Sequence, residues 1–305
     1  MAVKYYMKRL VSRYYEKAFR ASITKVRELP AISNYCDENN VILLTMVQKK
    51  DVDMFLLAAK TLLNYLSVKK VVVVMDPTID QDDINILKQH LVNVEFVRAT
   101  DYRLPGVPVG GCWERIMALA DYAQEYYVIQ LDADTLTLSR PDEVIECVRN
   151  NVSFTLGTRD GVEIKDRETA SEFSKSRIEL GRDHIQLLAE FNLENLPSNY
   201  LNYVRGNAGF VGVKKGGIKK AQLIEVCQLY TDLLGDRWRE WGSEQFTCNL
   251  LISNIDGAVV LPHEYYCVPA KDRPNAKFLH YIGDVRFANK NYQQTSLGVI
   301  KQLAA

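Results

Sequence analysis

Residues 126–134 read Tyr126-Tyr127-Val128-Ile129-Gln130-Leu131-Asp132-Ala133-Asp134. This apolar run, rich in aromatic and β-branched residues, predicts a buried strand at the centre of an α/β sheet. In such sheets ligands bind beyond the carboxyl ends of the strands, which is where the two aspartates stand. Alternate residues of an extended backbone point to the same side, so Asp132 and Asp134 suit a hard divalent cation, Mn²⁺ or Mg²⁺. Short acidic triplets also occur in solvated turns and helix caps, and it is the preceding strand that favours a metal site.

Strand-like and helix-like segments alternate from residue 41 onward. Strand-like runs cover residues 41–46, 71–75, 94–97 and 152–156. Helical spacing covers residues 53–66 and 113–124, and further helices are expected to open at Asp82-Asp83 and at Pro141. This β-α-β order predicts an α/β fold with a mostly parallel sheet and helices on both faces. Residues 160–200 are polar and mixed, and are expected to form helices and loops beside the sheet.

Composition limits the classes of protein to which the chain can belong. Its 305 residues can bury a full core, and no linker divides them, so we expect one catalytic domain over residues 37–305. The 38 basic and 38 acidic residues give no overall field for nucleic acid. No apolar run reaches the length of a membrane span, and the first ten residues lack the pattern of a secretory signal. The six cysteines show no metal-ligand spacing, which indicates reduced thiols in a cytoplasmic protein.

Residues 1–36 form a basic, amphipathic segment that is expected to be helical. Among the first thirty residues, eight basic side chains outnumber two acidic ones, an excess of six. Aromatic and apolar residues are interleaved with them at near-helical spacing, a pattern typical of a helix on an anionic membrane surface. A helix that packs against the catalytic domain or against a second subunit would show the same pattern, so both alternatives stay open, as does the oligomeric state.

Three further motifs lie far from the aspartates in the sequence. The string 280–286 holds His280, Gly283 and Arg286; an imidazole is a good third ligand for Mn²⁺, and a guanidinium can bind a diphosphate. The second motif is residues 207–209, which begins with Asn207. In the third, Ser243 is expected to cap a helix, with Glu244 and Gln245 in the first turn of that helix.

In the order of these motifs the chain resembles the nucleotide-sugar-dependent glycosyltransferases of the GT-A fold. It is most similar to glycosyltransferase family 8, the group of glycogenin and the bacterial lipopolysaccharide galactosyl- and glucosyltransferases. The matching motifs are Leu-Asp-Ala-Asp at residues 131–134, Asn-Ala-Gly at 207–209, Glu-Gln through Asn at 244–249, and His-x-x-Gly-x-x-Arg at 280–286. The resemblance covers, loosely, residues 41–287. The chain departs from the family pattern at Glu244, where Asp is usual, at Arg286, where Lys is usual, and at Phe287.

The resemblance implies a role for each matched residue. Asp132, Asp134 and His280 would hold Mn²⁺ or Mg²⁺, and Gln245 with Glu244 would lie at the anomeric centre. The residues implied in donor binding are Thr45, Met46, Val47, Arg115, Asp132, Ala133, Asp160, Asn207, Gly283 and Arg286. Arg115 has an alternative interpretation as the salt-bridge partner of a helix face.

The implied activity is a Mn²⁺-dependent, retaining transfer of a hexose from a nucleotide sugar, expected to be a UDP-sugar. The acceptor would be a glycan, a glycolipid or a protein hydroxyl. The alternative is a catalytically silent protein of the same fold that binds a nucleotide or a partner. A sugar nucleotidyltransferase is disfavoured, because residues 45–50 contain no glycine-rich loop.

Overall fold

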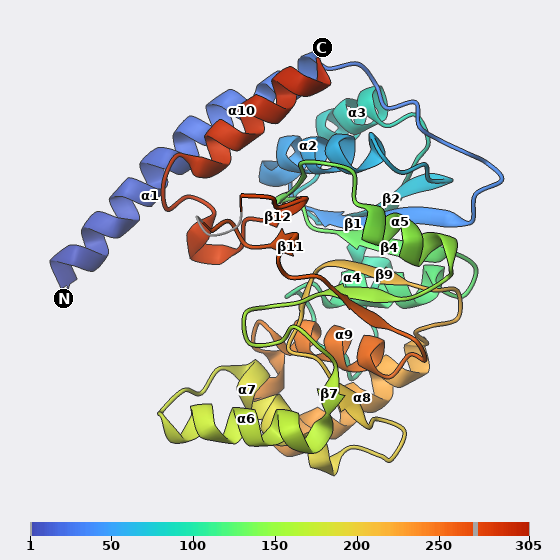
Figure 1. Ribbon diagram of the computed structural model, residues 1–305, viewed down its shortest axis with the longest axis vertical. Helices are drawn as coiled ribbons and strands as arrows, with labels where there is room; N and C mark the ends of the chain where they lie inside the picture. Colours follow the sequence, from blue (N-terminus) through green and yellow to red (C-terminus); the bar gives the residue numbers. More distant parts are fainter. Residues whose placement is uncertain (1, 271–273, 305) are drawn as a thin grey trace.

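A seven-stranded sheet forms the centre of the computed structural model, which describes residues 2–270 and 274–304 (Figure 1). The strand order is β10-β6-β9-β4-β1-β2-β3. The strands are β1 (Val41–Val47), β2 (Lys70–Met75), β3 (Val94–Arg98), β4 (Tyr127–Leu131), β6 (Phe154–Leu156), β9 (Asn207–Val213) and β10 (Val259–Leu261). β1 pairs in parallel with β2 and β4, β2 with β3, and β6 with β10. The predicted mostly parallel sheet is confirmed. Its exception is β9, which runs antiparallel to both of its neighbours.

Successive side chains of each strand point to opposite faces of the sheet, and a hydrophobic core lies on each face. In β1, Leu43 belongs to the first core and Ile42 to the second. Residues of α1 (Ala2–Ile23), α2 (Val52–Leu63), α3 (Gln81–His90), α5 (Asp142–Arg149) and α10 (Asn291–Leu303) contribute to the first core. The second takes residues of α4 (Trp113–Tyr122), α7 (Ile185–Phe191), α8 (Lys220–Leu234) and α9 (Ser243–Ser253). Helices thus cover both faces, as expected.

Two small sheets flank the main one. β5 (Thr135–Thr137), β12 (Phe278–His280) and β11 (Tyr266–Cys267) form a three-stranded sheet beyond the end of β4. β7 (Lys165–Asp166) pairs with β8 (Asn202–Tyr203) beside α6 (Arg167–Glu179). Short 3₁₀ helices complete the fold: η1 (Thr24–Glu28), η2 (Lys49–Asp51), η3 (Ala99–Tyr102), η4 (Leu193–Asn195), η5 (Gly235–Arg239) and η6 (Gly283–Val285).

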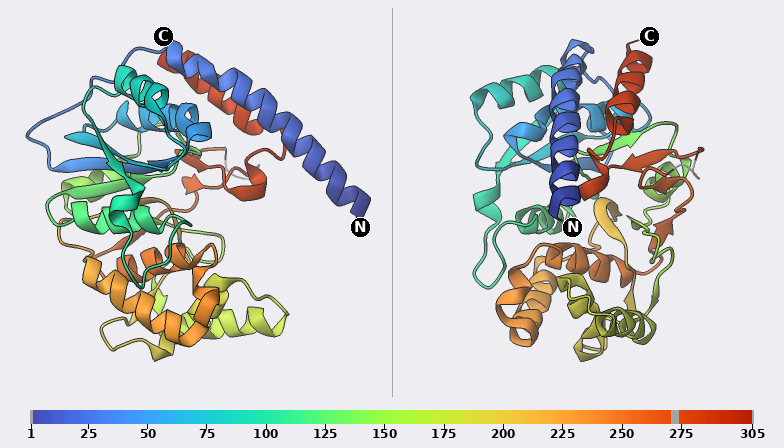
Figure 2. Two further views of the ribbon diagram at one scale, coloured as in Figure 1. Left: turned by 180° about the vertical axis from the view of Figure 1, so that it is seen from behind. Right: turned by 90° about the vertical axis from the view of Figure 1, so that its left-hand side faces the viewer.

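The N-terminal helix α1 has two halves with different surroundings. Its second half packs against α10: the Phe19 ring stacks on Tyr292 at 4.3 Å between centroids, and Gln293 Nε2 donates to the Ala18 carbonyl at 3.0 Å. Its first half projects past the rest of the chain (Figure 2). The packing alternative therefore holds for one half only, and the boundary after residue 36 stays a prediction.

Two further sequence expectations can be compared with the fold. Within residues 2–270 and 274–304, none of the helices combines the length and the apolar character needed to cross a bilayer. None of the cysteines in the described residues forms a disulfide, and their reduced state stays a prediction.

Candidate functional site

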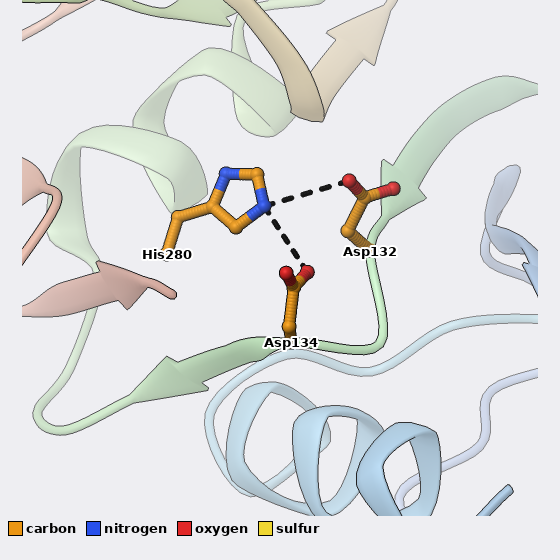
Figure 3. Close-up of side chains that lie close together, drawn as sticks. All are labelled: Asp132, Asp134 and His280. Atoms are coloured by element: carbon orange, nitrogen blue, oxygen red, sulfur yellow. Dashed lines mark hydrogen bonds and ion pairs between the residues drawn. The ribbon is translucent and has the colours of Figure 1, made fainter. Parts of the chain in front are cut away.

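The backbone beyond β4 brings His280 to the two aspartates. A tight turn joins β4 to β5, and the Thr135 hydroxyl donates to the Asp132 carbonyl across it at 2.8 Å. β12 pairs antiparallel with β5 in a register that sets His280 opposite Thr135. The backbone N–H of Tyr281 then donates to the Asp134 carbonyl at 2.9 Å. Because strand pairing fixes both segments, the three side chains converge from distant parts of the sequence (Figure 3).

The three side chains fit a divalent cation. One ligand atom from each of Asp132, Asp134 and His280 lies within 4.8 Å of the others. His280 Nε2 stands 3.1 Å from Asp134 Oδ1 and 3.5 Å from Asp132 Oδ2, so both carboxylates face the same ring nitrogen (Figure 3). Two carboxylates and an imidazole are a ligand set that suits Mn²⁺, and the carboxylates also suit Mg²⁺.

Positively charged side chains pair with the two carboxylates. Arg115 pairs with Asp132, and Arg286 pairs with Asp134. Burial alone would raise the pKa of Asp132, but the Arg115 charge and His280 together hold this pKa well below its usual range. Burial also opposes protonation of His280, yet Asp134 and Asp132 outweigh it and raise the pKa of the imidazole to about 9. A divalent cation would therefore take the place of the imidazole proton.

Helix α9 supplies Glu244 and Gln245 from its first turn, as predicted, but Ser243 is not the cap. Gly242, at φ +112°, occupies the N-cap position. The Ser243 hydroxyl instead accepts from Trp113 Nε1 and donates to the Glu240 carbonyl, both at 3.0 Å. The expected cap was wrong because the helix begins one residue earlier: Ser243 is already its first residue, and its hydroxyl bonds to Trp113 and Glu240.

Glu244 lies close to Asp132 through a shared partner. Arg115 Nη2 stands 3.3 Å from Glu244 Oε1, while Nη1 of the same guanidinium pairs with Asp132. Burial raises the pKa of Glu244 to about 7, against the opposing charge of Arg115. Arg115 therefore stands as the salt-bridge partner of two carboxylates.

A chain of hydrogen bonds between largely buried side chains holds the Gln245 amide. Gln245 Nε2 donates to Gln186 Oε1 at 3.1 Å, and Gln186 Nε2 donates to the Tyr203 hydroxyl at 3.2 Å. The Tyr203 hydroxyl donates to Glu190 Oε1 at 2.8 Å, and Arg205 pairs with the same carboxylate. Sequence reasoning missed Gln186, Tyr203, Glu190 and Arg205, since they lie in or next to the mixed region 160–200 and match no motif.

A cavity of about 450 Å³ opens beside His280 and Gln245. Asn207, at the start of β9, also lines it, and its Oδ1 accepts from the Gly209 N–H at 2.8 Å. Asp160 lies at the half-exposed rim, 3.8 Å from Arg177 Nη2. The other lining residues are Leu156, Gly157, Thr158, Arg159, Gln186, Arg205, Gly206, His263, Tyr266, Cys267, Val268, Pro269, Ala270 and Ile282. Asn207, Asp160, Gln245 and His280 are thus brought together around one space.

The remaining sequence-predicted site residues lie outside that lining. Thr45 and Val47 are fully buried in β1, where the Thr45 hydroxyl donates to the Leu131 carbonyl at 2.8 Å. Met46 and Ala133 are half-buried, and Gly283, at φ +41°, begins η6. The donor-binding roles of these residues stay predictions.

Comparison with known proteins supports the fold. No family model and no curated protein matches the chain. An active-site mutant of LgtC, described in a second structure as a galactosyltransferase, superposes with a TM-score of 0.52 at 11% identity, over 87% of this chain and 96% of LgtC. The bifunctional glycosyltransferase WbbM gives 0.49 at 13% identity over 86% of this chain, which spans about half (52%) of WbbM. Mouse xyloside xylosyltransferase 1 gives 0.47 at 14% identity, over 81% of this chain and 98% of that protein.

The likeness to LgtC confirms the α/β fold of the GT-A type. At 11% identity it shows the fold alone, so membership of glycosyltransferase family 8 stays a prediction.

Proposed function

We propose that the chain is a divalent-metal-dependent glycosyltransferase that uses a nucleotide-sugar donor. One observation carries the proposal: Asp132, Asp134 and His280 converge within 4.8 Å next to a cavity that Gln245 lines. A GT-A-type fold gives this arrangement a place at the carboxyl end of the central strand, where such sheets bind ligands. In finer terms, we propose Mn²⁺, a UDP-sugar donor, a hexose and retention of the anomeric configuration.

Asp132, Asp134 and His280 would hold the metal ion. When bound, the ion supplies Lewis-acid stabilisation of the departing diphosphate. Arg286 Nε donates to the Tyr281 carbonyl at 3.1 Å, which fixes its guanidinium at the edge of the site for diphosphate oxygens. Arg115 holds Asp132 and Glu244 in place, so its contribution to donor binding would be indirect.

Gln245 and Asn207 face the cavity and would contact the sugar near its anomeric carbon, with Asp160 as an acceptor for sugar hydroxyls at the rim. The acceptor molecule would be a glycan, a glycolipid or a protein hydroxyl. We also propose a cytoplasmic location, because the spacing of the six cysteines indicates reduced thiols.

The test is a thermal-shift screen of nucleotide sugars with and without Mn²⁺, followed by a measurement of nucleoside diphosphate release. A ligand that binds only the folded state raises the melting temperature, so we expect a rise with one nucleotide sugar that depends on Mn²⁺. Asp134→Asn keeps the side-chain shape and should abolish both the metal-dependent rise and turnover. Asp142→Asn, a surface carboxylate that pairs with Arg140 and Lys277, is the matched control and should behave as wild type.

The alternative, a silent protein of the same fold, predicts a different result. It would bind a nucleotide with Mn²⁺ and release no diphosphate from any nucleotide sugar. Binding of no nucleotide sugar under any condition would contradict the transferase proposal itself.

A further inference from the structure

The projecting half of α1 carries an unusual number of exposed apolar side chains. We define the α1 stripe as Tyr6, Met7, Leu10, Val11 and Tyr14, which are 63, 55, 42, 43 and 66% exposed. Single exposed apolar residues are common on protein surfaces, but five of them within nine positions of one helix form a continuous surface.

The α1 stripe faces away from the protein body. Phe19 and Ile23, further along the helix, are buried in the first core at 1 and 3% exposure. Successive residues of an α-helix turn by about 100°, so Leu10, nine positions before Phe19, lies about 180° from it. By the same rule the other four residues of the stripe lie about 80 to 140° from Phe19, so the stripe as a whole points away from the core.

Basic residues border the α1 stripe. Arg9, Arg13 and Lys17 follow one another at four-residue spacing along one edge, and all three are exposed. Lys8 lies on the other side. Glu16 is the only acidic residue between positions 6 and 20, and it pairs with Arg20 at 2.9 Å. Since the whole chain has a formal net charge of zero, this cationic border is local.

We propose that the α1 stripe docks the protein in the plane of an anionic lipid bilayer. A helix with apolar side chains on one face and Lys or Arg beside them lies in the interface between headgroups and acyl chains. Tyrosine rings such as those of Tyr6 and Tyr14 are enriched at that depth. Each basic residue near an anionic surface contributes favourably. Pairing of two α1 stripes would instead bring the basic borders of two copies together.

Docking would also tether the candidate site. The Phe19 ring lies 5.5 Å from the ring of Phe287, which follows Arg286 directly. The second half of α1, which packs against α10, therefore contacts the segment that carries His280. A bilayer location would supply a lipid-linked acceptor, and this last step alone rests on the proposed transferase activity.

Co-sedimentation with phosphatidylcholine vesicles, with and without phosphatidylglycerol, tests the docking. We expect the wild type to bind the anionic vesicles, to bind the neutral ones poorly, and to dissociate at high salt. Leu10→Glu should weaken binding at least about tenfold, because it places a charge in the apolar face. Arg13→Glu should weaken it at least about fivefold.

Matched controls distinguish a loss specific to the α1 stripe from the general effect of adding a negative charge to the surface. Leu180→Glu makes the same change at a residue that is 74% exposed at the end of α6, and Arg149→Glu reverses a charge on the exposed side of α5; both should bind as wild type. Melting temperatures should be unchanged, since the mutated side chains are exposed. The assay needs no turnover, so its result is independent of the proposed reaction.

Three outcomes would overturn the inference. The first is vesicle binding by Leu10→Glu that equals that of the wild type, and the second is equal binding of the wild type to neutral and anionic vesicles. The third is no binding of the wild type to anionic vesicles; a wild-type dimer in light scattering that Leu10→Glu converts to a monomer would then assign the stripe to a second copy of the chain.

Discussion

Gly209 sets how closely β9 can pass the candidate metal ligands. A Cβ atom at this position would stand 2.1 Å from His280 Cε1 and 2.7 Å from Asp132 Oδ2, well inside normal contact distance. The Gly209 carbonyl also accepts the Asp132 N–H at 2.7 Å, so the strand cannot move away without losing that bond. The absence of a side chain at Gly209 is therefore a condition for the arrangement of Asp132 and His280.

Gly209→Ala should accordingly displace His280 or Asp132 and weaken Mn²⁺ binding at least about tenfold, with a loss of about 1–3 kcal/mol in the free energy of unfolding. Calorimetric titration with Mn²⁺ and urea unfolding measure the two effects. Gly298→Ala is the control, because nothing lies within 4 Å of the added methyl group in α10. It should lower neither the Mn²⁺ affinity nor the free energy of unfolding. Wild-type metal affinity in Gly209→Ala would contradict this account of the site.

Lys60 is a residue whose burial makes stability depend on pH. Its ammonium donates to the Pro30 carbonyl, and burial lowers its pKa to about 8, against 10.5 for the unfolded chain. Between pH 8 and 10.5 the unfolded state binds more protons than the folded state, so stability rises with pH in that window. Below pH 8 both states are protonated, and the folded state bears the full cost of the buried charge.

Relative to Lys60→Met, the wild type should gain up to about 1.4 kcal/mol per pH unit between pH 8 and 10.5. Urea unfolding of both proteins across this range measures the difference in their free energies of unfolding. Other titrating groups contribute equally to both proteins and cancel in this difference. A difference that stays constant with pH would mean that Lys60 keeps its ordinary pKa in the folded state.

At the scale of elements, α7 and α9 share the task of orienting Gln245. The bond from Gln245 to Gln186 fixes the amide of the proposed catalytic residue, and Tyr203 and Glu190 fix Gln186 in turn. Small displacements at a reacting centre cost large factors in rate.

Gln186→Leu should therefore lower kcat at least about tenfold and leave the donor KM nearly unchanged. In a Gln245→Ala background the same substitution should add nothing further, because its effect passes through Gln245. Gln228→Leu, on the exposed side of α8, serves as the control. An equal loss in both backgrounds would show that Gln186 acts on the substrate by itself.

The sequence could predict those elements whose signal is local. The apolar runs of β1, β2 and β4 and the helical spacing of α2 and α4 lie within single segments, so their type and approximate limits were correct. The antiparallel direction of β9 and the pairing of β12 with β5 depend on residues far apart in the chain, and no local pattern encodes them. His280 could be placed beside Asp134 only through the resemblance to a family, whereas Gln186 belongs to no motif and could not be found.

At the scale of the whole molecule, the two halves of α1 have different surroundings. Its second half belongs to the first hydrophobic core, together with strand residues such as Leu43 and Ile129. Its first half offers the α1 stripe to another surface. A domain boundary after residue 36 would therefore divide the first core, which residues on both sides of the boundary form. The change in composition near that position does not reveal this shared packing.

Phe19→Ala should lower the free energy of unfolding by about 3–5 kcal/mol, because it leaves a cavity between α1, Phe287 and Tyr292. Tyr14→Ala, five positions earlier and 66% exposed, should change it by less than about 0.5 kcal/mol. Urea unfolding compares the two aromatic truncations within one helix. Equal effects would mean that α1 does not pack on α10 as described.

The pairing of β12 with β5 also has a consequence for folding during synthesis. Asp134 and His280 are separated by 146 positions, and neither has its partner until both exist. During synthesis, residue 280 must leave the exit tunnel of the ribosome before the proposed metal site can be complete. A polypeptide that ends between Leu261 and His280 would contain all seven strands of the central sheet and would lack one of the three proposed metal ligands.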